Sequence, residues 1–101
     1  MAKVSAVERN KRRLRIVSQQ SSKRIALKKI VMDKSVTLEE RFNAMLQLCS
    51  LPRDGSKVRI RNRCEISGRS RGVYRDFRLS RLALRELGSF GKIPGIIKSS
   101  W

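Results

Sequence analysis

Cys64 is the first of four positions whose spacing matches that of a zinc-binding ribbon. Two residues separate positions 64 and 67, twelve separate 67 and 80, and two separate 80 and 83. Four cysteines at this C-x2-C-x12-C-x2-C spacing would hold a tetrahedral zinc ion. Here the positions hold Cys64, Ser67, Ser80 and Ala83. A neutral serine is a poor zinc ligand and alanine is none, so the sequence predicts the frame of a metal site with no bound metal or other cofactor.

Arginine is the second residue type with evident chemistry. The chain of 101 residues has 25 Lys and Arg against 8 Asp and Glu, a net charge of +17, and 16 of the cations are arginine. The planar guanidinium binds phosphate through two hydrogen bonds and stacks on bases. A polyanion would also relieve the self-repulsion of so basic a chain. We therefore expect RNA contacts from Arg53, Arg59, Arg61, Arg63, Arg69, Arg71, Arg75, Arg78, Arg81 and Arg85, and from Arg12, Arg13 and Lys28 in the N-terminal segment.

Several other classes of protein are disfavoured. The chain has no histidine, no convergent pair of carboxylates and no glycine-rich phosphate loop ahead of a helix, which argues against an enzyme. The N-terminus lacks the apolar segment of a secretory signal, and no apolar run approaches the roughly 20 residues of a membrane span. We expect an intracellular protein with Cys49 and Cys64 reduced, no membrane partner and no homo-oligomer. A basic DNA-binding protein stays open as an alternative, although no helix-turn-helix pattern or dimerisation repeat supports it.

The expected fold is mainly α and irregular. It combines an extended N-terminal helical arm with a small C-terminal module that resembles a zinc ribbon without zinc. Residues 1–50 would form the basic arm and an amphipathic helix, and residues 51–101 an arginine-rich RNA-binding module with a tail. Residues 3–32 are basic and helical in pattern, but the polar run at residues 18–22 predicts two helices or one bent helix. With little of its own chain to pack against, this arm is expected to order on RNA or a partner protein.

The remaining elements are shorter. Thr37 and Glu40 have the spacing of a capping box, and the apolar face of the helix that follows ends before Pro52. Residues 57–61 alternate between cations and aliphatic side chains, which favours an extended segment along phosphates. A last helix would begin at Ser80 as N-cap and end at Gly88.

Two aromatic side chains allow alternative interpretations. Tyr74 and Phe77 lie among the arginines of the second half and could stack on splayed bases. They could equally form the small core of this module, and for Phe77 the core is the favoured interpretation.

A set of short motifs resembles one family over essentially the whole chain. The motifs are L-P-R-D at 51–54, R-N-R-C at 61–64, G-R-S-R-G at 68–72, L-S-R-L-A-L-R-E-L at 79–87, I-P-G at 93–95 and K-S-S-W at 98–101. In this order they resemble the bacterial-type small-subunit ribosomal protein fourteen family. Of its two forms, the chain resembles the long one, which has an N-terminal helical extension and has lost most zinc cysteines.

The resemblance implies a function that composition alone does not give. It implies a structural constituent of the 30S subunit of a bacterial or organellar ribosome, in the cytoplasm in the bacterial case. It also implies binding to 16S rRNA in the subunit head, and small-subunit ribosomal proteins three, ten and nineteen as neighbours. A part in 30S assembly and in shaping the rRNA near the A site, the decoding region, is implied as well.

Overall fold

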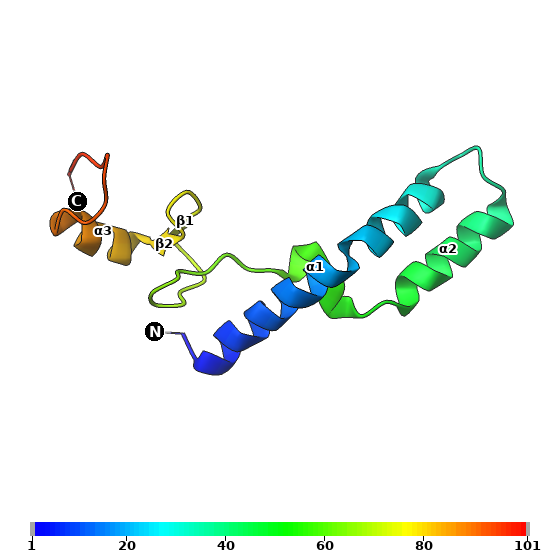
Figure 1. Cartoon of the computed structure of the whole chain (residues 1–101), viewed down its shortest axis with the longest axis horizontal. Helices are drawn as coiled ribbons and strands as arrows, with labels where there is room; N and C mark the ends of the chain where they lie inside the picture. The colour runs from blue at the N-terminus through cyan, green and yellow to red at the C-terminus, as the bar shows by residue number, and fades with distance from the viewer. Residues whose placement is uncertain (1, 101) are drawn as a thin grey trace. The chain divides into compact units, whose positions relative to one another are not determined.

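The computed structural model describes residues 2–100, and these divide into two packed units. One unit consists of residues 9–60, and the other combines residues 2–8 with residues 61–100. Three α-helices and a two-stranded sheet account for most of the regular structure in the described part of the chain (Figure 1). The prediction of a mainly helical protein is confirmed.

Helix α1 spans Val4–Met32 and is continuous over its 29 residues. The two-helix alternative for this segment is therefore wrong. The hydroxyl of Ser18 donates to the carbonyl of Arg15 at 2.8 Å, and that of Ser21 donates to the carbonyl of Ser18 at 3.1 Å. Because these serines bond to carbonyls of the preceding turn, the polar run is compatible with a helix and does not end it.

Helix α2, Leu38–Ser50, runs back antiparallel to α1 and buries Ala44 (Figure 1). It ends before Pro52 as predicted. Thr37 does occupy the N-cap position, but its side chain makes no capping hydrogen bond, so the predicted capping box is wrong. The connection is ordered instead by Asp33, whose carboxylate accepts from the amide and hydroxyl of Ser35 at 2.9 and 2.7 Å.

Two short 3-10 helices follow, η1 at Arg53–Gly55 and η2 at Lys57–Arg59. The predicted extended segment at residues 57–61 is wrong over its first three residues. The winding places Arg59 within 2.8 Å of the Asp54 carboxylate, and this ion pair favours the compact turn over an extended strand.

The other unit is built on a small hairpin and one helix. Strand β1, Val73–Tyr74, pairs antiparallel with β2, Leu79–Ser80, and α3 follows at Arg81–Ser89. Ser80 is the N-cap as predicted, because its hydroxyl accepts from the amide of Ala83 at 3.2 Å.

The end of α3 lies beyond the predicted Gly88. The amide of Lys92 donates to the carbonyl of Leu87 at 3.0 Å, and the amide of Gly91 donates to that of Gly88 at 3.1 Å. With Gly91 at φ 66°, this is a Schellman motif. The turn requires a positive φ, which glycine adopts without strain, so Gly91 ends the helix and Gly88 lies within it.

The core of this second unit is small. Cys64, Leu79 and Ala83 are buried together, and the half-buried Val73, Leu84, Leu87 and Ile93 pack around them.

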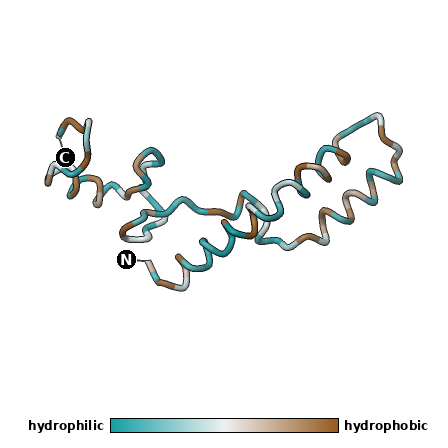
Figure 2. The backbone as a smooth tube through the Cα atoms, in the orientation of Figure 1, coloured by the Kyte–Doolittle hydropathy of each residue, from teal (hydrophilic) through white to brown (hydrophobic). Residues whose placement is uncertain are grey.

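Hydrophilic and hydrophobic residues are interspersed along the helices (Figure 2). Within residues 2–100, no helix has the length and apolar character needed to cross a membrane.

Candidate nucleic-acid interface

Cys64 begins a tight loop that shapes the arginine-rich segment. Its amide donates to the carbonyl of Arg69, and the amide of Gly68 donates back to the carbonyl of Cys64, both at 2.9 Å. The amide of Ser67 points to the Cys64 sulfur, with a nitrogen-to-sulfur distance of 3.5 Å. These bonds fix the backbone from which the neighbouring arginines project.

Gly68 fixes this loop against the first turn of α1. Its φ of 72° is strained for other residues, and an added Cβ would lie 2.8 Å from the Cγ2 atom of Val7. Gly68 is buried, and its backbone lies close to its own chain.

The Cys64 thiol lies in an unusual environment. Burial alone would raise the pKa of the thiol. Hydrogen bonds from Ser67 and from the backbone at Ser80 and Ile66 outweigh this effect and lower the pKa to about 6. The loop therefore favours the thiolate. Two of the ribbon-spaced positions, Ser67 and Ser80, therefore supply donors to the sulfur, and Ile66 supplies a third.

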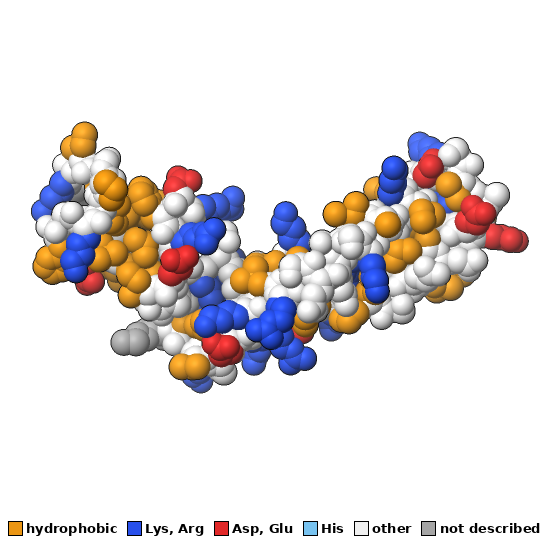
Figure 3. Space-filling model, in the orientation of Figure 1, with side chains coloured by type: hydrophobic (Ala, Val, Ile, Leu, Met, Phe, Trp, Pro, Cys, Tyr) orange, Lys and Arg blue, Asp and Glu red, His pale blue; other side chains and the backbone are white. Residues whose placement is uncertain are grey.

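Ten of the thirteen predicted RNA-contacting side chains are exposed to solvent. They are Arg12, Lys28, Arg53, Arg61, Arg69, Arg71, Arg75, Arg78, Arg81 and Arg85. Six of them fall between residues 69 and 85, around the hairpin and along α3. Over the visible face, Lys and Arg side chains outnumber Asp and Glu side chains (Figure 3). The surface therefore offers cations for phosphate, although RNA contact by these residues stays a prediction.

Three of the thirteen are half-buried and bonded within the chain. The Asp54 carboxylate lies 2.8 Å from a terminal nitrogen of Arg59 and 3.4 Å from Nε of Arg13. Arg63 donates to the carbonyl of Gly68 at 2.9 Å. Asp54 thus joins α1 to the 3-10 turns, and the positive charge of two predicted contacts is already partly neutralised.

Among the described residues, Arg78 is the one non-glycine residue with a positive φ, at 53°. Its carbonyl accepts from the amide of Glu65 at 3.0 Å, and its guanidinium lies 3.5 Å from the Glu65 carboxylate. The side chain is 77% exposed, so the ion pair is weak. A left-handed arginine costs conformational energy that glycine would avoid, and such strain is characteristic of functional positions.

Sequence reasoning missed two arginines that hold the helical hairpin together. Arg24 donates to the carbonyl of Pro52 at 2.7 Å, and Arg41 donates to the carbonyl of Val31 at 3.1 Å. Their acceptors are backbone carbonyls, which leave no residue-type signal in a sequence. These two side chains serve the fold, and they show that a basic residue here is not automatically an RNA contact.

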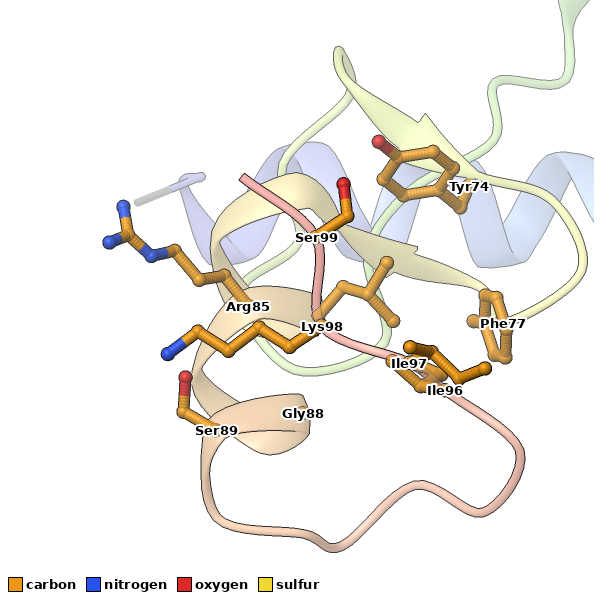
Figure 4. Close-up of a pocket in the computed structure, with 10 residues that line it drawn as sticks. Tyr74, Phe77, Arg85, Gly88, Ser89, Ile96, Ile97, Lys98 and Ser99 are labelled. Carbon is orange, nitrogen blue, oxygen red and sulfur yellow. The ribbon is translucent and has the colours of Figure 1, made fainter. Parts of the chain in front are cut away.

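Tyr74 and Phe77 are 46% and 41% exposed, so the favoured assignment of Phe77 to the core is wrong. Both rings border a cleft of about 390 Å³ between α3 and the C-terminal tail, which Lys98 also lines (Figure 4). Sequence reasoning did not include Lys98, because nothing in the sequence places the tail beside α3.

The ribbon-spaced positions do not provide a zinc site. Only Cys64 carries a zinc-binding side chain, and residues 2–100 contain no cluster of three or more His, Cys, Asp and Glu side chains suited to a metal ion. One thiolate cannot replace the four ligands of a structural zinc site.

Comparison with known proteins defines the family. The family described as ribosomal protein S14p/S29e matches residues 47–100. Over 101 residues, covering all of both chains, this chain is 65% identical to the small ribosomal subunit protein uS14 of Agrobacterium fabrum. The chain belongs to the uS14 family. The uS14 proteins of Rhizobium etli and Brucella anthropi are 64% and 63% identical over the same full length. Membership in the uS14 family covers the helical arm as well as the arginine-rich half.

Proposed function

We propose that this chain binds 16S rRNA in the head of the small ribosomal subunit and stabilises the folded rRNA there. As a uS14 family member it is a structural, non-enzymatic ribosomal protein of the small subunit, acting in translation. The observation that carries the finer proposal is the exposed arginine set at residues 69–85, displayed on a hairpin and a helix with little competing acid.

The physics of this surface suits RNA backbone recognition. Arginines spread over a hairpin and a helix can neutralise the phosphates of several RNA strands at once. Such contacts recognise the shape of the RNA more than the identity of its bases. Helix α3 adds to this, because it begins with Arg81 and has no acidic residue in its first turn. The positive end of the helix dipole therefore adds to the charge of the arginine, and both effects would stabilise a phosphate bound at this end.

We also propose that the second unit is a ribbon-like module that functions without zinc, and the loop at Cys64 supports this. Hydrogen bonds to the sulfur and the Ser80 cap hold the two halves of the frame, and the core of Cys64, Leu79 and Ala83 takes the place of a metal centre. Loss of a structural metal removes folding free energy, which RNA contacts would restore on assembly.

The partners follow from the family and remain part of the proposal. The expected neighbours are 16S rRNA and the small-subunit ribosomal proteins three, ten and nineteen. The expected contributions are to 30S assembly and to the shape of the rRNA near the A site. A basic DNA-binding protein is disfavoured by the family, and RNase rather than DNase sensitivity of the native complex would separate the two.

A sucrose-gradient experiment tests this function. A tagged full-length chain expressed in its native cells should co-sediment with small subunits and with 70S ribosomes, and RNase should move it to the top of the gradient. A chain that stays at the top without RNase treatment would refute the proposal. Tagged copies of a cytosolic protein of similar size serve as the control.

A further inference from the structure

The cleft beside α3 has the chemistry of a nucleotide site. Its walls are the rings of Tyr74 and Phe77 and the aliphatic side chains of Leu84 and Ile96. At about 390 Å³ it falls within the range of about 300 to 1,000 Å³ found for small-molecule sites. The tail forms one side because the Schellman turn at Gly91 reverses the chain, and Ile96 then packs over Gly88.

Charge distinguishes the occupant. Among the residues that the structure describes, the lining includes Arg85 and Lys98 and no acidic side chain. The two rings lie on one side of the view, and the cationic ends of Arg85 and Lys98 lie on the other (Figure 4). An occupant with a flat apolar part and an anionic part would match both sides. A purely apolar segment of a protein partner would bury the Lys98 ammonium without offering it an acid.

We propose that the cleft binds one unstacked nucleotide of rRNA, with the base against Tyr74 and Phe77 and the adjoining phosphate at Arg85 and Lys98. This rests on the proposed rRNA binding and adds a base-stacking contact to it. Aromatic side chains at such sites stack on any base, so the site selects an unpaired nucleotide rather than a particular sequence.

Leucine substitutions test the stacking contact while keeping an apolar side chain. Full-length Tyr74→Leu and Phe77→Leu proteins are compared with wild type for binding to a transcript of the 3′ major domain of 16S rRNA over a series of KCl concentrations. Loss of a stacked base should weaken binding about 5- to 150-fold. The slope of log affinity against log salt should not change, because no charge is lost. Phe90→Leu is the matched control, since Phe90 is 74% exposed and does not line this cleft.

Two further measurements separate stacking from a structural role. Tyr74→Trp should bind at least as tightly as wild type, because it keeps an aromatic face. Ultraviolet irradiation of native small subunits, followed by mass spectrometry, should yield nucleotide adducts on Tyr74 or Phe77 and none on Phe90.

Each outcome decides between the two proposals. Wild-type affinity of both leucine variants for the transcript, or the absence of adducts at the cleft, would overturn the nucleotide site and indicate a protein occupant. Equal loss in the leucine and tryptophan variants would overturn it in favour of a structural role. Failure of the wild-type chain to bind rRNA at all would instead refute the proposed function.

Discussion

The exposed arginines around the hairpin allow a quantitative prediction. Arg71, Arg75 and Arg81 are exposed, and all lie within the segment proposed to cross phosphates. We consider their simultaneous replacement by glutamine, which keeps polar side chains of comparable reach and removes three charges. The Cδ atom of Arg81 lies near Gly72, and glutamine retains that atom, so local packing should survive.

The magnitude follows from the number of exposed cations. Ten of the predicted contacts are exposed, and each neutralised phosphate contributes about 0.7 to 0.9 to the salt slope. Wild type should therefore show a slope of roughly −7 to −9 in log affinity against log salt. Removing three contacts should reduce it to roughly −5 to −6, together with a marked loss of affinity at moderate salt.

The assay is filter binding of the full-length chain to the 3′ major domain transcript over a KCl series. The control replaces Lys23, Lys29 and Lys34 by glutamine, which removes the same charge from exposed positions outside the predicted set. The slope of log affinity against log salt for the control should differ from that of wild type by less than about 1. Equal slopes for the arginine variant and wild type, or equal losses in both triple variants, would refute the assignment of contacts to this segment.

Three smaller predictions concern the fold. Asp54→Asn should lower the free energy of unfolding by about 1 kcal/mol in thermal denaturation, because Arg13 and Arg59 lose their shared acidic partner. An unchanged melting temperature would show that these ion pairs do not stabilise the fold. The pKa of Cys64 is lowered from 9.0 to about 6 on folding, so its contribution to stability should fall as the pH is reduced from 9 to 6. Cys64→Ser should remove that pH dependence, and a retained dependence would assign it to another group. Replacing Ser67, Ser80 and Ala83 by cysteine should produce a protein that binds one zinc ion by elemental analysis, and no zinc would mean that the four positions do not converge.

Much of the helical structure could be predicted because local signals decide it. The α2 helix ends before Pro52, where proline excludes helical backbone, and Ser80 caps α3 through its own hydroxyl. The failures occurred where another group competed. Serines in α1 bonded within the helix, Asp33 rather than Thr37 ordered the connection to α2, and Gly91 rather than Gly88 supplied the left-handed turn.

The site was less predictable than the helices. Sequence composition identified arginine as the functional residue type, but it could not distinguish exposed arginines from those bonded within the chain. Arg13 and Arg59 share Asp54, and Arg24 bonds to a backbone carbonyl 28 positions away. The cleft also depends on a tail that folds back over α3, which no local pattern in the tail indicates. The assignment of separate roles to residues 1–50 and 51–101 stays a prediction.

The most direct measurement of the central claim is an electron cryo-microscopy structure of the intact small subunit from the native organism. We expect the chain in the subunit head, with the arginines at residues 69–85 against rRNA phosphates and the ribbon-spaced positions free of metal density. The account would be contradicted by a chain absent from the subunit, or by one whose residues 69–85 face solvent while another surface contacts the rRNA.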